Sequence, residues 1–200
     1  MTIDQRGSRN DYDRVPELIR VLNRAISGLV LPFARTQGDE LQGVTGDPGE
    51  AVKAALAALR VAQWSVGIGA GPVDEPLPAS SPEARGPAFV LARQAVEAAK
   101  GGRRVLPPVA VRSAQADLAR DCESALQLLA TLRAERSSQG WEACDLMSQT
   151  GMTGRQAARR LGISPQALGD RLKAAHWHLD CQALRLSIRL MSVLDETIQA

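Results

Sequence analysis

Residues 153–175 read TGRQAARRLGISPQALGDRLKAA, and this stretch decides how the second half of the chain folds. Thr153 and Gln156 match a capping box, in which two side chains satisfy backbone groups at the start of a helix. The LGISP segment at 161–165 predicts that this helix ends at its glycine and that another begins at once, because serine caps helices and proline fits their first position. Two helices so close together cross at a steep angle, so the pattern predicts a helix-turn-helix.

Small and apolar side chains occur where the two helices would face each other. They are Ala158, Leu161, Ile163, Leu168 and Leu172. The preceding segment, WEACDLMSQTGMTG at residues 141–154, predicts a supporting helix followed by a turn. We therefore expect an all-α, trihelical unit in residues 137–200, preceded by a connecting helix in residues 113–136.

The segment AARRLGISPQALGDRL at residues 157–172 resembles the fourth region of sigma factors and related trihelical regulators. The motif of that group reads approximately A-x-x-L-G-I-S-x-x-x-V-x-x-R-L. Gly169 and Asp170 depart from it, because such proteins often carry Lys, Arg or Ser at these two positions. The resemblance implies double-stranded DNA as the partner.

Basic residues gather in this part of the chain. Residues 152–175 hold five basic residues and one acid, a local charge of +4, whereas the whole chain carries +2. With the second helix in the major groove, Gln166 is the best base reader and the arginines of the first helix contact phosphates. The predicted DNA-binding residues are Arg155, Gln156, Arg159, Arg160, Ser164, Gln166, Asp170, Arg171 and Lys173. Helix pairs with glycine turns also occur in bundles that do not bind DNA.

Residues 1–112 show a different pattern, in which short strand-like runs broken by glycine alternate with helical stretches. The order strand, helix, hairpin, helix, strand, helix, strand predicts a ferredoxin-like or cyclase-like α+β sandwich with its helices on one face. A short first strand is expected around Asp4. Helices are expected at 15–26, 51–61 and 86–100, and further strands at 30–36, 42–45, 64–71 and 104–111. The glycines at 66–71 predict a close approach of another backbone or a ligand.

Four segments of this half resemble the SatD family of bacterial proteins: ID-x-x-GSR at 3–9, TQGDELQGV at 36–44, VGIGAGPV at 66–73 and GPAFVLARQA at 86–95. This family looks like a relative of class III nucleotide cyclases, in which an Asp on the first strand and another at the hairpin hold metal ions. The resemblance implies that Asp4 and Asp39 match that pair, with Gly38 and Glu40 beside them, and that a nucleotide or Mg²⁺ is an effector. The other interpretation takes Asp39 and Glu40 as hairpin-tip residues and Asp4 as a cap of the first turn.

The helix at residues 86–100 departs from the cyclase pattern. Where cyclases carry an Asn and an Arg that stabilise the transition state, this chain has Val90 and Gln94. Arg93 is displaced by one position, which on a helix rotates it by about 100°. We therefore expect no enzymatic activity, no catalytic residue, no bound metal and no required cofactor. Two alternatives stay open: Mg²⁺-dependent phosphoryl chemistry on a nucleotide at Asp4 and Asp39, and an interaction module that contacts RNA polymerase.

The end of the chain carries an apolar stripe at helical spacing. Its members are Leu179, Ala183, Leu186, Leu190, Val193 and Leu194, within a helix expected at residues 178–198. Such a stripe is usually intramolecular core. Because this one follows the expected DNA-binding unit, we also expect a homodimer that reads a two-fold operator.

The composition excludes other classes of protein. No apolar run reaches the length of a membrane span, and the start MTIDQRGSRNDYD lacks the apolar segment of a signal peptide, so we expect a cytoplasmic protein without a membrane partner. The three cysteines lie far apart, which predicts buried free thiols rather than a disulfide or zinc site. Together the patterns predict a dimeric DNA-binding transcriptional regulator whose catalytically degenerate cyclase-like domain senses a nucleotide.

Overall fold

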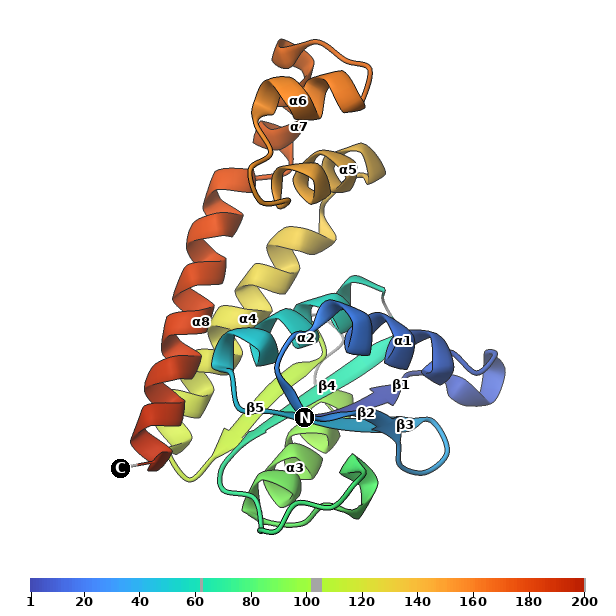
Figure 1. The fold of residues 1–200 in the computed structure, drawn as a ribbon, viewed down its shortest axis with the longest axis vertical. Coiled ribbons are helices and arrows are strands. Elements are labelled where there is room, and N and C mark those ends of the chain that lie inside the picture. Colours follow the sequence, from blue (N-terminus) through green and yellow to red (C-terminus); the bar gives the residue numbers. More distant parts are fainter. Residues whose placement is uncertain (62, 102–105, 200) are drawn as a thin grey trace.

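A five-stranded sheet occupies one end of the molecule, and α4 and α8 lead from it to three short helices at the other end (Figure 1). The computed structural model describes residues 1–61, 63–101 and 106–199. The sheet unit contains β1 (Thr2–Gln5), α1 (Val15–Ala25), β2 (Leu29–Arg35), β3 (Glu40–Thr45), α2 (Pro48–Arg60), β4 (Trp64–Ala70), α3 (Pro87–Gly101) and β5 (Val109–Ser113), with 3-10 turns η1 (Ser8–Asn10) and η2 (Ser81–Glu83). The helices that follow are α4 (Ala116–Ala134), α5 (Ser138–Met147), α6 (Gly154–Arg160), α7 (Pro165–Ala174) and α8 (Trp177–Gln199). The α+β class is confirmed.

The elements of the first half occur in the predicted order. The Asp47 side chain accepts hydrogen bonds from the amides of Gly49 and Glu50, which explains the start of α2. The last strand differs from its expected range of 104–111, because β5 begins only at Val109, after two prolines that cannot donate to a sheet ladder. Residues 104 and 105 of that expected range lie outside the described residues.

The strands lie in the order β2-β3-β1-β4-β5. The pairs β2–β3, β3–β1 and β1–β4 are antiparallel, whereas β4 and β5 are parallel. The central strand is β1, in which Ile3 pairs with Leu41 on one side and Val66 on the other. All three of these side chains are fully buried, so β1 anchors the sheet despite its four residues.

The prediction that all helices of this unit cover one face of the sheet is wrong. Helices α1 and α2 lie on one face, and α3 lies on the other (Figure 1). A Cβ on Gly67 would lie 2.3 Å from the backbone N of Val96, and a Cβ on Gly69 would lie 2.2 Å from the carbonyl O of Ala88. The glycines of β4 therefore let the backbone of α3 approach closely, as the 66–71 pattern predicted.

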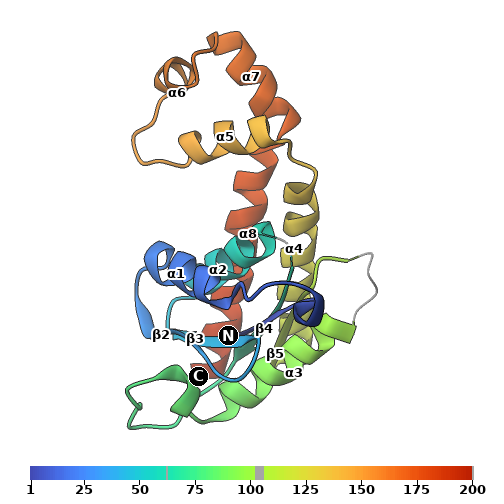
Figure 2. The same ribbon diagram turned by 90° about the vertical axis from the view of Figure 1, so that its right-hand side faces the viewer.

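Helix α8 belongs to the core of the sheet unit as well as to the second half of the chain. Its Met191 and Leu194 are buried in the same hydrophobic cluster as Val66 of β4 and Leu126 and Leu129 of α4. The expected division placed residues 137–200 in one separate unit, whereas α8 runs back along α4 to the sheet (Figure 2). The reason is that one side of the α8 stripe supplies core side chains.

The other side of the α8 stripe stays on the surface. Leu179, Leu186 and Val193 are 53%, 54% and 38% exposed, and they recur every seven residues. The stripe thus divides into a face that packs inside the chain and a face without an apolar partner among the described residues. No helix in the described ranges 1–61, 63–101 and 106–199 is sufficiently long and apolar to cross a membrane.

Candidate functional site

Helices α6 and α7 begin where the sequence predicted, and they end at Arg160 and Ala174, slightly before the expected Gly162 and Ala175. Thr153 Oγ1 accepts a hydrogen bond from the Gln156 amide at 3.3 Å, and the Thr153 amide donates to Gln156 Oε1 at 2.9 Å, which completes the capping box. Gly162 takes the left-handed conformation, with φ of 65°. Ser164 then caps α7 by accepting from the Ala167 amide at 3.1 Å.

The helices α5, α6 and α7 pack around a small hydrophobic cluster of their own. Ala143 of α5, Ala157 and Ala158 of α6 and Leu168 of α7 are its buried members. The half-buried side chains against it are Leu146, Met147, Met152, Leu161, Ile163 and Leu172. All five inner-face residues expected from the sequence belong to this cluster, so the opposite faces of α6 and α7 are left for solvent.

Eight of the nine predicted DNA-binding residues are exposed: Arg155, Gln156, Arg159, Arg160, Ser164, Gln166, Asp170 and Lys173. On α7, Gln166, Asp170 and Lys173 follow one another at helical spacing and share a face. On α6, Arg155 and Arg159 are four residues apart and also share a face. Both helices lie at the end of the molecule farthest from the sheet (Figure 1).

Some of these residues are engaged within the protein. Gln156 and Ser164 act as caps, and Arg160 donates to Gln149 Oε1 at 2.9 Å. Arg171, the half-buried member of the set, lies 3.9 Å from Glu142 of α5. Gln166 Nε2 donates to Asp170 Oδ1 at 3.4 Å. Of the five cations in this set, Arg155, Arg159 and Lys173 have neither an ion pair nor a side-chain hydrogen bond among the described residues.

A buried ion cluster holds the α5–α7 unit on its two supporting helices. Asp180 of α8 is 2% exposed and accepts from Arg133 Nε at 2.7 Å, and Arg136 approaches the same carboxylate at 2.8 Å. Arg136 also donates to the carbonyl O of Ala175 at 3.0 Å. The end of α4 and the start of α8 are thereby joined at the turn that follows α7.

The structure brings Asp4 and Asp39 to one pocket of about 590 Å³, which Ser8, Ser65 and Lys100 also line. Lys100 Nζ of α3 lies 2.7 Å from Asp4 Oδ2, and the Ser8 hydroxyl donates to Asp39 Oδ2. Burial raises the pKa of Asp4, and the Lys100 ammonium only partly offsets this. Burial lowers the pKa of Lys100, but the hydrogen bonds to Asp4 and Glu97 and the negative charges of these two carboxylates together outweigh it, so the net shift is upward.

Gly38 and Glu40 do not line that pocket. Glu40 is the first residue of β3, is 5% exposed, and lies 2.9 Å from Arg93 of α3, which corrects its interpretation as a hairpin-tip residue. Gly38 is at the hairpin tip with φ of 60°, and its carbonyl accepts from Arg35 at 2.6 Å. Arg93, displaced by one position from the cyclase pattern, therefore neutralises a buried carboxylate.

The side chains of Asp4 and Asp39 are each engaged by another side chain. In the described part of the chain, no three His, Cys, Asp or Glu side chains come together in a way that could hold a metal ion. Asp4 is paired with an ammonium and Asp39 with a hydroxyl. The residues present do not fit a metal ion between the two aspartates.

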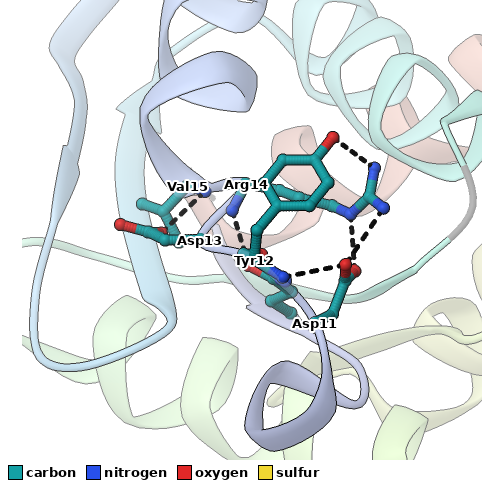
Figure 3. A network of polar contacts seen from close by, with 6 residues as sticks. Asp11, Tyr12, Asp13, Arg14 and Val15 are labelled. Atoms are coloured by element: carbon teal, nitrogen blue, oxygen red, sulfur yellow. Dashed lines mark hydrogen bonds and ion pairs between the residues drawn. The ribbon is translucent and has the colours of Figure 1, made fainter.

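The loop from β1 to α1, which carries Ser8 into this pocket, is held by the polar network of Figure 3. Arg14 Nε donates to Asp11 Oδ2 at 2.6 Å, and its guanidinium lies 4.1 Å from the centre of the Tyr12 ring. Gln5 Nε2 donates to the Tyr12 carbonyl O at 2.8 Å, and Gln5 Oε1 accepts from the Arg14 amide at 3.0 Å. The loop is therefore tied to the end of β1.

Sequence reasoning missed the contact that joins α5 to the sheet unit. Arg60 of α2 binds Asp145 through two hydrogen bonds, and its guanidinium lies 4.0 Å from the centre of the Trp141 ring. No local pattern could indicate this, because Arg60 and Asp145 are 85 residues apart.

In comparisons with known proteins, no family model, curated protein or solved structure matches this chain. What the protein does must be inferred from the residues that its own fold exposes.

Proposed function

We propose that this protein is a DNA-binding transcriptional regulator in which α6 and α7 form a helix-turn-helix and α7 is the recognition helix. The observation that carries the proposal is the exposed face of α7, with Gln166 and Lys173, beside the two uncommitted arginines of α6. A short helix pair with a packed inner face and a basic outer face is suited to the major groove.

The residues divide into two roles. Gln166, in the first turn of α7, reads a base edge, because its amide can both donate and accept in the major groove. Arg155, Arg159 and Lys173 contact phosphates, which supplies affinity and little sequence information. Asp170 opposes phosphate binding on the same face and weakens the interaction.

The sheet unit is the regulatory part in this proposal and has no enzymatic activity. The strand order β2-β3-β1-β4, with α1 and α2 as crossovers, supports a ferredoxin-like, cyclase-like fold for residues 1–70. The ion pairs of Arg93 with Glu40 and of Lys100 with Asp4 argue against turnover at this sheet. A nucleotide effector for the Asp4 pocket stays a proposal, to be tested by calorimetric titration with ATP and GTP.

A second copy of the chain completes the proposal. Leu179, Leu186 and Val193 form an exposed apolar row on α8, which a second α8 would bury. Two copies would present two recognition helices to a two-fold operator. Light scattering after size exclusion should give a dimer, and Leu186→Glu should give a monomer; a monomeric parent would contradict this part.

DNA binding is tested by selection from a random-sequence duplex library, followed by fluorescence anisotropy over a salt series. The logarithm of the binding constant should fall linearly with the logarithm of salt concentration, and Lys173→Ala should reduce that slope by about 1. Arg159→Ala should act in the same way. Arg24→Ala, an exposed arginine of α1, is the matched control.

Two results would contradict the proposal. One is the absence of binding to any duplex at low salt. The other is equal binding by the Arg159, Lys173 and Arg24 variants, because salt-dependent attraction would then not involve α6 and α7. Capture of RNA polymerase without any affinity for DNA would favour the interaction-module alternative.

A further inference from the structure

A pocket of about 310 Å³ lies where the sheet unit meets the ends of α4 and α5. Its walls come from α2, from the start of β4 and from the last turn of α4, and Trp141 of α5 closes one side. Apolar side chains, among them Leu56, Leu59 and Ala130, make up much of the lining. A largely apolar wall with a few polar groups is typical of small-molecule sites, and the volume is at the lower end of their range.

One polar group in this wall has no partner. Trp64 is 1% exposed, and its indole N–H finds no hydrogen-bond acceptor among the described residues. A buried donor in this condition is unfavourable, and native proteins almost always satisfy such groups. The nitrogen itself is closed to water, so a ligand in the pocket lies against the indole ring, and the N–H resonance reports on that neighbouring ligand.

Three arginines line the pocket, and two of them are already neutralised. Arg60 is bound to Asp145, and Arg133 is bound to Asp180. Arg6 has no ion pair among the described residues. Among the described residues, the free charge of the pocket is therefore a single guanidinium in a largely apolar wall.

Trp141 makes the wall rigid before any ligand binds. Two guanidinium groups contact its ring, with Arg60 4.0 Å and Arg136 4.9 Å from the ring centre. These two cation–π contacts restrict the ring. A pocket that is formed in advance loses little freedom on binding.

From this arrangement we infer that the pocket is a binding site for a small organic acid with an aromatic or branched aliphatic body. The carboxylate provides the counter-charge that Arg6 lacks. The apolar body lies against Leu59 and Ala130. This site is distinct from the pocket that holds Asp4 and Asp39, although Arg6 lines both.

The probe pair that tests the inference is 4-phenylbutyrate and its uncharged analogue 4-phenylbutan-1-ol. Each is titrated into the ¹⁵N-labelled full chain, and the three indole N–H resonances are followed by NMR. Trp141→Phe and Trp177→Phe assign two resonances and leave Trp64 by elimination. The Trp64 resonance should move saturably, and the acid should bind at least about tenfold more tightly than the alcohol, as expected of a charge-assisted hydrogen bond.

Variants locate the site. Arg6→Gln should remove the preference for the acid, and Ala134→Leu, a larger side chain in the pocket wall, should weaken both probes. Arg9→Gln, which changes an arginine that lines only the Asp4 pocket, is the matched control and should bind as the parent does. A Trp64 resonance that stays in place, equal binding of acid and alcohol, or insensitivity to both pocket variants would each overturn the inference.

The pocket has walls from the sheet unit and from the helices that support α6 and α7, so a bound acid contacts both parts. Where the proposed DNA binding holds, and only on that condition, 4-phenylbutyrate should change the affinity of the parent for DNA and not that of Ala134→Leu. The NMR titration contains no DNA, so its failure and the failure of DNA binding are separate results.

Discussion

The carboxylate of Asp145 on α5 accepts two hydrogen bonds, of 2.8 and 2.7 Å, from the guanidinium of Arg60 at the end of α2. The same guanidinium stacks on Trp141, so one side chain of the sheet unit holds α5 in two ways. Arg60→Ala should lower the free energy of unfolding by about 1–2 kcal/mol, because it removes the pair and the cation–π contact. Asp145→Asn should cost under about 1 kcal/mol, since both partners are partly exposed. Urea unfolding measures both, and equal losses would contradict the role of Trp141.

Asp180 is the most deeply buried acid of the helical half, and two arginines converge on it. Asp180→Ala should lower the free energy of unfolding by about 3–5 kcal/mol, because Arg136 would remain buried without its counter-charge. Asp117→Ala, which changes an exposed acid of α4, should cost less than about 0.5 kcal/mol. Urea unfolding followed by circular dichroism compares the two variants. A small loss for Asp180→Ala would mean that the cluster contributes little to the joint between α4 and α8.

Gly67 and Gly169 provide a matched pair for the effect of one added methyl group. Gly67→Ala places a Cβ against the α3 backbone and should cost about 1–3 kcal/mol or more. Gly169→Ala meets nothing within 4 Å and lies inside α7, so it should stabilise the protein by up to about 1 kcal/mol. Thermal unfolding of the two variants checks the difference in sign. Equal melting temperatures would show that α3 is packed less closely than described.

The pKa of Asp4 predicts a pH dependence of stability. Burial raises the folded-state pKa above the ordinary value of 3.8, so the folded protein holds this proton more tightly than the unfolded chain. The stability contributed by Asp4 is therefore highest below pH 3.8 and falls as the pH rises through the folded pKa. Urea unfolding between about pH 3 and pH 7 should show the parent losing stability relative to Asp4→Asn as the pH increases. Asp117→Asn, which changes an exposed acid, is the control. If the parent lost as much stability with rising pH relative to Asp117→Asn, the assignment to Asp4 would be contradicted.

Asp170 lies on the outer face of α7, where the resemblance to sigma-factor regions leads one to expect Lys, Arg or Ser. Asp170→Lys should raise DNA affinity by about tenfold and steepen the salt dependence by about one unit, because a repulsive charge becomes a phosphate contact. Asp117→Lys changes the net charge by the same amount on α4 and should have a much smaller effect. Fluorescence anisotropy with the selected duplex measures both, and equal gains would indicate attraction without a defined binding face.

The local elements of the second half could be predicted from the amino-acid sequence. Thr153, Gly162 and Ser164 mark the ends of α6 and α7, because caps and left-handed turns depend on a few neighbouring residues. The order of elements in the first half and the close approach at the glycines of β4 were predictable too, because they also follow from patterns within short segments. The apolar spacing also identified the inner faces of α6 and α7.

The face of the sheet that α3 covers and the place where α8 packs became known from the folded chain. Glu40, expected at a hairpin tip, is instead buried and paired with Arg93. Arg60 contacts Asp145 and Trp141. The physical reason is that these contacts join residues far apart in the chain, and their partners are chosen by the burial of shared apolar surface. Local propensity is silent about that choice, so the pocket at the Trp64 indole could be found only in the folded chain.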